Sequence, residues 1–427
     1  MKLWQKANSI DSKVSTFTVG KDREYDLILA QYDCKASIAH ANMLAKVGLL
    51  TKNEAKKLTI ELKTIAKNVE DGMFSIPDSF EDMHSRIEFL LTEKLGTLGK
   101  KIHTARSRND QVLVALQLYV KEEIQTIKKS SFSLFELLIE LAKKNKGVLL
   151  PGYTHMQVAM PSSFGLWFSA YAETLIDDVV MLNAAFAIAD QNPLGSAAGF
   201  GTSFPIDRKA TTDALDFSDL KYNVVAAQMG RGKVEKAAIQ AIGQLGATLS
   251  KLAMDICLYM GQDFDFIHFP EKLTTGSSIM PHKKNPDIFE LIRGKCNLLQ
   301  GLPHQLSLLY SNLPSGYHRD MQLAKGLLIE AFNEIKSCLD MFQYSLAQIK
   351  VNKNLLEMSK YDHLFTVDTL NEWVKGGMPF REAYKKMGEI IAAGNYKPEK
   401  RVSHSHLGST GNLALEAIRS KMQNQLD

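Results

Sequence analysis

The placement of proline is the feature of this sequence that most limits its fold. The chain has 12 prolines in 427 residues, yet none lies between Asp78 and Leu150, between Ile206 and Phe269, or between Ser315 and Met378. A proline inside a helix costs about 3 kcal/mol, so long helices are permitted where proline is missing. The sequence therefore allows three very long helical segments.

Apolar residues in these segments recur at alternating steps of three and four, the spacing of one helix face. Two stripes are continuous, with Ser131 in one polar slot, and the third is looser. They comprise Leu113, Leu116, Val120, Ile124, Ile127, Leu134, Leu138 and Leu141; Val234, Ala238, Ile242, Leu245, Leu249, Leu252, Ile256 and Tyr259; and Ile335, Leu339, Phe342, Leu346 and Ile349. Each stripe predicts a helix of about 25 residues, roughly 40 Å long.

Strand signals, in contrast, are scarce. Period-two alternation of any length is rare, and no strand–glycine loop–helix repeat occurs, which disfavours a doubly wound α/β sheet. We predict an all-α fold with a central bundle of long helices. Stripes of this length need partners along their whole length, which favours association between identical chains. A monomeric helical solenoid is the weaker alternative, because no internal repeat is visible.

Composition shifts near residues 105 and 350 divide the chain. They predict an N-terminal helical domain (1–105), a central long-helix bundle domain (106–350) and a C-terminal helical domain (351–427). Segments dense in Gly, Pro, Ser and Asn are predicted loops. These loops are 151–161, 192–205 and 274–286.

Charge and cysteine usage exclude several classes of protein. The net charge of +4 is too small for a surface that coats nucleic acid. The N-terminal region has no apolar signal segment, and no window approaches about 18 apolar residues, so a membrane partner lacks support. The four cysteines are far apart and form no C-x-x-C pair, which indicates reduced thiols and a cytoplasmic location. They are Cys34, Cys257, Cys296 and Cys338.

The loop TTGSSIMPHKKNP (274–286) concentrates groups that bind anions. Gly276 permits close backbone approach, and Asn285-Pro286 would end the loop just before a new helix, which places free N–H groups beside Lys283 and Lys284. An ordinary solvated surface loop is the alternative that composition alone favours.

The order of residues in this loop decides between the two. Gly-Ser-Ser-Ile-Met-Pro-x-Lys-Lys-Asn-Pro resembles the signature of the fumarase/aspartase superfamily of lyases. The chain is similar to the argininosuccinate lyase family within it through HTARSRNDQ (103–111), GYTHMQVAMP (152–161), KKNPDIFELIRGK (283–295), LPSGYHRDMQLAK (313–325) and the region 365–389. The resemblance implies a homotetramer whose active sites are each assembled from three subunits. It also implies β-elimination of argininosuccinate to arginine and fumarate in arginine biosynthesis.

This reaction needs a base for a weak carbon acid, a cradle for a dianionic intermediate and an acid for the leaving nitrogen. Ser277 matches the family's catalytic serine, whose alkoxide would be stabilised by N–H groups, by Lys283 and by a helix N-terminus. His155 matches the proton-transfer histidine and Glu290 its carboxylate partner. Without the flanking motif, a histidine in such a turn is more often a satisfied turn residue.

The resemblance also implies residues that bind the substrate. They are Asn109, Thr154, Asn285, Tyr317, Gln322 and Lys325, with Ser107 and Arg108 close enough to contribute. The guanidinium of Arg108 offers the fork that carboxylates fit. Alternatively, Ser107, Asn109 and Asp110 cap a helix that begins near Gln111, and Lys325 lies on a solvated helix face.

No metal or nucleotide cofactor is implied. His404 and His406 fall short of a metal site, and neither G-x-G-x-x-G nor a P-loop occurs. The chain departs from the family pattern in having His282 in place of glutamine, Leu323 and Ala324 in place of an acidic pair, a divergent 207–233 region, and no counterpart of the N-terminal binding serine in 17–23.

Two other functions remain possible on the sequence. One is a lyase acting on adenylosuccinate or a related substrate that releases fumarate, against which HTARSRNDQ and the doubled lysine argue. The other is a non-catalytic structural relative of the crystallin type. A purely structural protein has no physical reason to keep an activatable serine, which argues against this second alternative.

Overall fold

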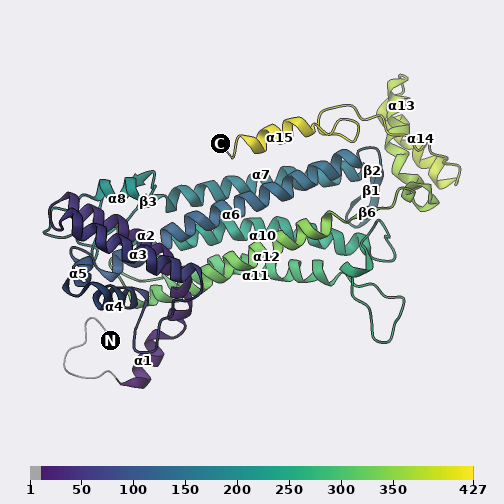
Figure 1. The fold of residues 1–427 in the computed structure, drawn as a ribbon. Coiled ribbons are helices and arrows are strands. Elements are labelled where there is room, and N and C mark those ends of the chain that lie inside the picture. Colours follow the sequence, from purple (N-terminus) through teal and green to yellow (C-terminus); the bar gives the residue numbers. More distant parts are fainter. Residues whose placement is uncertain (1–10, 427) are drawn as a thin grey trace. The chain divides into compact units, whose positions relative to one another are not determined.

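The computed structural model describes residues 11–426, and its elements run from α1 (Ser12–Val19) to α15 (Leu415–Gln423) (Figure 1). Long helices dominate, and the predicted all-α fold with long helices is confirmed as a mostly helical one. The helices of 23 residues or more are α2 (Asp22–Lys46), α6 (Arg108–Lys144), α7 (Phe164–Ala189), α10 (Lys233–Met260), α11 (Asp287–Leu309) and α12 (Ala324–Leu346).

The chain divides into two compact units. Of the described residues, unit 1 comprises 11–127, 181–244 and 298–335, and unit 2 comprises 128–180, 245–297 and 336–426. Helix α2 belongs to unit 1, and each of the other long helices contributes residues to both units.

The three apolar stripes fall on α6, α10 and α12. Their residues are buried except Tyr259, which is half-buried, and Ser131 in the polar slot of the first stripe is buried as well. The third stripe runs past its helix, because α12 ends at Leu346 and Ile349 follows it. The long helices α2, α7 and α11 were not predicted, and α11 contains Pro303.

Unit 1 is built around a helical cluster near the N-terminus. Helix α2 (Asp22–Lys46) packs along α3 (Lys52–Glu70), and α4 (Met83–Leu95) packs against both (Figure 1). Helix α3 begins with a capping box, in which Thr51 Oγ1 accepts from the Glu54 N–H and the Glu54 carboxylate accepts from the Thr51 N–H. The remaining helices of this unit are short. They are α5 (Thr97–Lys100), η1 (Lys101–His103), α8 (Arg208–Ala214), α9 (Val224–Met229) and η3 (Arg319–Leu323).

Strands are few and short among the described residues. In unit 2, β1 (Leu149–Thr154) and β2 (Gln157–Ser163) form an antiparallel hairpin, and β5 (Ile267–His268) pairs antiparallel with β6 (Lys350–Val351). In unit 1, β3 (Gln191–Asn192) pairs in parallel with β4 (Asp219–Leu220). The hairpin occupies the segment 151–161 predicted as a loop, so that prediction was wrong.

The C-terminal part of unit 2 contains small helices. Helices α13 (Thr366–Lys375) and α14 (Phe380–Ala392) share a core of Leu370, Ala383 and Met387. Two 3-10 helices precede them, η4 (Leu355–Glu357) and η5 (Ser359–Phe365), and η2 (Glu271–Leu273) leads into the predicted anion-binding loop. No helix in residues 11–426 combines the length and the apolar character needed to cross a membrane.

Candidate active site

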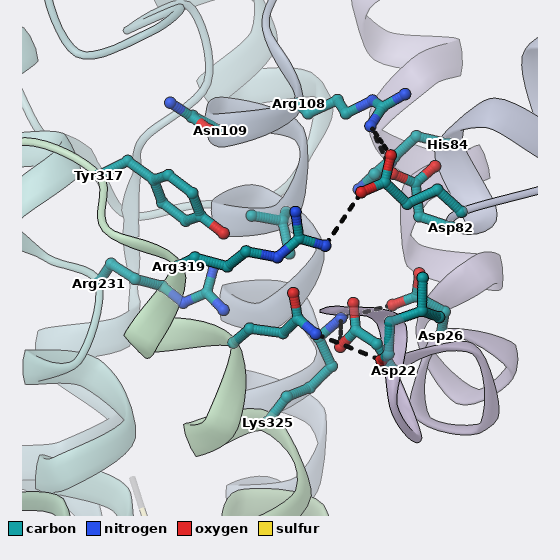
Figure 2. Close-up of a pocket in the computed structure, with 14 residues that line it drawn as sticks. Asp22, Asp26, Asp82, His84, Arg108, Asn109, Arg231, Tyr317, Arg319 and Lys325 are labelled. Atoms are coloured by element: carbon teal, nitrogen blue, oxygen red, sulfur yellow. Dashed lines mark hydrogen bonds and ion pairs between the residues drawn. The ribbon is translucent and has the colours of Figure 1, made fainter. Parts of the chain in front are cut away.

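Unit 1 contains a cavity of about 250 Å³ lined mainly by charged and polar side chains (Figure 2). Five of the predicted substrate-binding residues lie in its lining. They are Arg108, Asn109, Tyr317, Gln322 and Lys325. The first two start α6, and the other three come from the segment that leads into α12 and from its first turn. The structure thus brings together two motifs that lie about 200 residues apart in the chain.

Lys325 is buried in this cavity, with only 3% of its side chain exposed, so the alternative of a solvated helix face was wrong. Its Nζ lies 2.7 Å from Asp22 Oδ1 and 2.6 Å from Asp26 Oδ1. Burial alone would lower the pKa of Lys325, but the two carboxylates outweigh burial and raise it. The ammonium therefore stays charged and is held by α2.

Arg108 is engaged by groups of the protein itself. Its Nη1 lies 3.0 Å from Glu81 Oε2 and 3.2 Å from Asp82 Oδ2, and its Nη2 donates to Ser85 Oγ at 3.1 Å. The fork expected to bind a substrate carboxylate is thus already occupied by two carboxylates. Arg108 orders the acidic wall of the cavity.

The start of α6 lies at Arg108, three residues before the predicted start near Gln111. Ser107 caps this end, as its Oγ accepts from the Asn109 N–H at 3.3 Å. Ser107 itself does not line the cavity.

Asp110 ties this helix start to the predicted loop 192–205. Its side chain is fully buried, with Oδ1 accepting from the Ser107 N–H at 2.9 Å and Oδ2 accepting from the Gly195 and Ala197 N–H groups at 3.0 Å each. Burial raises the pKa of Asp110 to about 6. Asp110 therefore positions the backbone around the cavity and does not face a ligand.

Sequence reasoning missed several residues of the lining. Asp22 and Asp26 lie one helical turn apart on α2, and Glu81 and Asp82 precede the buried His84. The i, i+4 spacing of the two aspartates and the acid-acid-x-His run were signals that could have identified them. Arg231 and Arg319 also line the cavity and offered no such local signal.

The segment 17–23, which lacks the family's serine, still contributes to the cavity through its backbone. Gln322 Nε2 donates to the carbonyl oxygens of Thr18 at 3.0 Å and Val19 at 3.3 Å. Arg319 Nη2 donates to the Thr18 carbonyl oxygen at 3.0 Å. Main-chain oxygens thus hold two side chains of the cavity in place.

Unit 2 contains a second cavity, of about 510 Å³, formed by the loop predicted to bind anions, by the start of α11 and by the end of α10 with the residues that follow it. Lys283, Asn285 and Glu290 line it together with His282, the residue that departs from the family pattern. Helix α11 begins at Asp287, immediately after Asn285-Pro286, so the predicted end of the loop is confirmed.

Ser277 lies in the same loop but outside the lining of this cavity. Its Oγ accepts hydrogen bonds from the backbone N–H groups of Ile279 at 3.4 Å and Met280 at 3.2 Å. Two amide dipoles are therefore directed at the oxygen that would carry negative charge as an alkoxide.

The base of the loop is fixed while the rest of it is exposed. Thr275 and Asn285 exchange backbone hydrogen bonds, and Asn285 Nδ2 donates to the Gly276 carbonyl at 3.1 Å. Thr275 Oγ1 also donates to the Asp287 carboxylate, which joins the loop base to the first turn of α11. The segment 276–284 is thus a loop held at its two ends.

Thr154 and His155 lie at the tip of the β1–β2 hairpin, where both are exposed. His155 and Met156 have φ values of 53° and 59°, as a two-residue type I′ turn requires, although neither is glycine. Within residues 11–426, His155 forms no ion pair with Glu290, and the tip lines neither cavity described above.

Comparison with known proteins gives a consistent result. Residues 11–301 match the model of a family described as lyase. The chain is 54% identical to the argininosuccinate lyase of Parabacteroides distasonis, over 99% of this chain and 95% of that protein. It is 52% identical to the argininosuccinate lyase of Bacteroides thetaiotaomicron, over 100% of this chain and 96% of that protein.

Solved structures agree in fold. An EDDS lyase variant with bound fumarate has a TM-score of 0.77 at 18% identity, covering 98% of this chain and 90% of that one. A class II fumarase from Schistosoma mansoni has a TM-score of 0.71 at 16% identity, covering 90% of this chain and 91% of that one. At these identities the likeness concerns the fold alone.

Proposed function

The chain belongs to the argininosuccinate lyase family of carbon–nitrogen lyases, and from this premise we propose how its residues cleave argininosuccinate into arginine and fumarate. The named relatives favour this activity over adenylosuccinate cleavage and over a structural role. The observation that carries the assignment of residues is the pair of N–H groups directed at Ser277 Oγ.

Ser277 acts as the base. Its alkoxide removes a proton from the carbon beside a carboxylate of the succinate part, and the Ile279 and Met280 N–H groups stabilise the alkoxide. Lys283 and Asn285 bind the carboxylate on which negative charge grows as the proton leaves. Contacts that strengthen as charge develops lower the barrier, so these two residues raise turnover rather than affinity alone.

His155 transfers a proton on the leaving-nitrogen side, with Glu290 as its carboxylate partner. Since the two form no ion pair within the described residues of one chain, we assign them to different chains of an oligomer. Helix α11, which carries Glu290, exposes large apolar side chains that a partner chain would cover. These are Leu291, Leu298 and Leu308, with exposed fractions of 63%, 76% and 63%.

The amino-acid end of the substrate occupies the unit 1 cavity. Tyr317, Gln322 and Asn109 face it as hydrogen-bonding groups, and Lys325 with Arg108 fixes the acidic side chains around them. Thr154 reaches this end from the hairpin tip of another chain, and Ser107 holds Asn109 at the start of α6. The proposed assembly is therefore a homotetramer whose active sites are shared between subunits.

We also propose that the chain has three domains, with boundaries at 105/106 and 350/351. We further propose a cytoplasmic location. The cysteines support the latter, since none of the four forms a disulfide and Cys34, Cys296 and Cys338 are buried.

The role of Ser277 as the base is tested by comparing substitutions of Ser277 and of its neighbour Ser278. Purified protein is incubated with argininosuccinate, and the ultraviolet absorbance of fumarate is followed. We expect Ser277→Ala to lower kcat by about 10²- to 10⁴-fold, the range for a lost proton-transfer group. The matched control Ser278→Ala changes the same atoms one residue away and should stay close to the parent protein. Equal losses in the two variants, or near-normal turnover of Ser277→Ala, would contradict the assignment.

The shared site is tested by mixing two inactive variants, His155→Asn and Ser277→Ala, after mild dissociation. Hybrids in which one chain supplies each intact residue should regain a fraction of the parent activity, while each variant treated alone should not. Light scattering before and after mixing gives the number of chains. Absence of recovery in proven hybrids would place both residues of a site on one chain.

A further inference from the structure

The unit 1 cavity contains a guanidinium whose hydrogen-bonding capacity is incompletely used. The side chain of Arg231 is only 3% exposed. Its Nη2 donates to the Met321 carbonyl at 3.1 Å and its Nε lies 2.9 Å from Glu235 Oε1, but its buried Nη1 donates to no acceptor among the described residues. A buried donor without an acceptor is costly, so such donors are usually functional or matched by a ligand.

The other cations of this cavity are more fully paired with acids of its wall. Lys325 contacts Asp22 and Asp26, and Arg108 contacts Glu81 and Asp82. Arg319, at 47% exposed, donates to Glu81 and to a backbone carbonyl. Arg231 differs, because the acid with which it forms an ion pair among the described residues, Glu235, is not part of the cavity lining.

The buried carboxylate of Glu235 holds the Arg231 side chain in place. Glu235, itself 2% exposed, lies in the first turn of α10, just after Arg231 in the chain, and also accepts from the Gly232 N–H at 2.7 Å. Figure 2 shows Arg231, Arg319 and Tyr317 directed from one side toward the middle of the cavity, with Asp22 and Asp26 on the other side. Lys325 contacts both carboxylates, and Arg231 acts on Asp22 by charge attraction, which opposes the rise that burial causes in the pKa of Asp22. With the guanidinium on one side and the two carboxylates on the other, the cavity offers a positive side and a negative side, as a zwitterion requires.

We propose that Arg231 binds the α-carboxylate at the arginine end of the substrate, with Asp22 and Asp26 facing the α-ammonium, and thereby selects substrates that carry an intact amino-acid head group. This inference rests on the proposed function and adds a specificity residue to it. A carboxylate oxygen is the acceptor that Nη1 lacks, and a guanidinium binds carboxylates in a fixed geometry.

The test compares arginine with agmatine, which is arginine without its carboxylate, as inhibitors of fumarate release. In the parent protein arginine should inhibit about 10- to 100-fold more strongly than agmatine, the range for a hydrogen bond to a charged group. In Arg231→Gln the ratio should fall toward one, because inhibition by arginine weakens while inhibition by agmatine changes little.

Two further variants separate recognition from folding. Arg231→Gln leaves the buried Glu235 unpaired, so the double variant Arg231→Gln/Glu235→Gln removes both charges and should show the same collapsed ratio. Glu235→Gln alone keeps the guanidinium and should keep most of the discrimination. An unchanged ratio in the folded single or double variant would overturn the proposal.

The comparison of arginine with agmatine in the parent protein tests the proposal without any variant. If arginine and agmatine inhibit it equally, the proposal is wrong even if every variant fails to fold. Failure of the proposed function would look different, since the parent protein would then release no fumarate from argininosuccinate. In that case calorimetric binding of arginine and agmatine still tests the head-group assignment.

Discussion

Asp178 on α7 should make the stability of this protein fall as the pH rises toward neutrality. Its side chain is fully buried, and neither carboxyl oxygen has a hydrogen-bond partner among the described residues. Burial raises the pKa of Asp178 from 3.8 to about 7, and the nearby Thr248 hydroxyl offsets only part of that rise. Between these two values the unfolded chain is ionised at this position while the folded chain keeps the proton.

The sign follows from this difference in bound protons. Folding takes up a proton between pH 4 and pH 7, so the free energy of unfolding decreases across that window and is constant above it. At about 1.4 kcal/mol for each unit, a pKa that rises from 3.8 to about 7 corresponds to roughly 4 kcal/mol at pH 8. About 3 kcal/mol of this loss falls between pH 5 and pH 8.

The substitution Asp178→Asn removes the titration while keeping the shape of a neutral carboxyl group. We expect it to raise the free energy of unfolding by roughly 3 kcal/mol more at pH 8 than at pH 5, as measured by urea denaturation at one fixed protein concentration. Asp177→Asn is the matched control, because Asp177 is adjacent but exposed, and it should change stability by less than about 0.5 kcal/mol. A gain that is the same at both pH values would refute the reasoning.

Two other changes test contacts that organise unit 1. Lys325→Met leaves Asp22 and Asp26 unpaired in a buried site and should lower the free energy of unfolding by about 3–5 kcal/mol. We expect faster hydrogen exchange in α2 and at the start of α12, and unchanged exchange in these segments would contradict the prediction. Thr51→Ala removes the capping hydroxyl of α3 and should lower the free energy of unfolding, measured by urea denaturation, by about 1 kcal/mol. Lys52→Ala, at the next residue, removes no capping group and should lower it far less.

The sequence predicted those long helices whose apolar residues lie on one face. Helices α6 and α10 carry a single stripe with polar residues opposite, and that pattern is visible without a structure. Helix α7 is apolar nearly all round, with Phe168, Leu175 and Leu182 buried, so it shows no distinct stripe. Helix α11 contains Pro303, and the loss of one backbone hydrogen bond there is outweighed by packing along the rest of the helix.

The candidate site was predictable where its residues are neighbours in the chain. Lys283, Asn285 and Glu290 were named because they match the family's motif within one short stretch of sequence, and all three line one cavity. The contact between Lys325 and Asp26 joins positions 299 residues apart, so no spacing in the sequence records it. Arg231 was missed for the same reason, since the 207–233 region departs from the family pattern and its partners in the cavity come from other segments.

The two cavities differ in how their charges are held, and that difference predicts how substitutions divide between KM and kcat. In the proposed mechanism the amino-acid end binds in the unit 1 cavity, where ion pairs hold Arg108, Arg319 and Lys325 before substrate arrives. We therefore expect contacts in this cavity to be equal in the ground state and the transition state. Tyr317→Phe should therefore raise KM by about 2- to 10-fold with little change in kcat.

Lys283 lies on an exposed loop, and in the proposed mechanism its ammonium binds the carboxylate whose charge grows during proton removal. Lys283→Met should lower kcat by about 10²- to 10³-fold with a smaller effect on KM, since the contact it removes strengthens only as the reaction proceeds. Lys284→Met is the matched control, because Lys284 forms an ion pair with Glu271 3.0 Å away. If Lys283→Met changed KM alone, the loop would serve binding rather than catalysis, and Ser277 would lose its proposed electrostatic support.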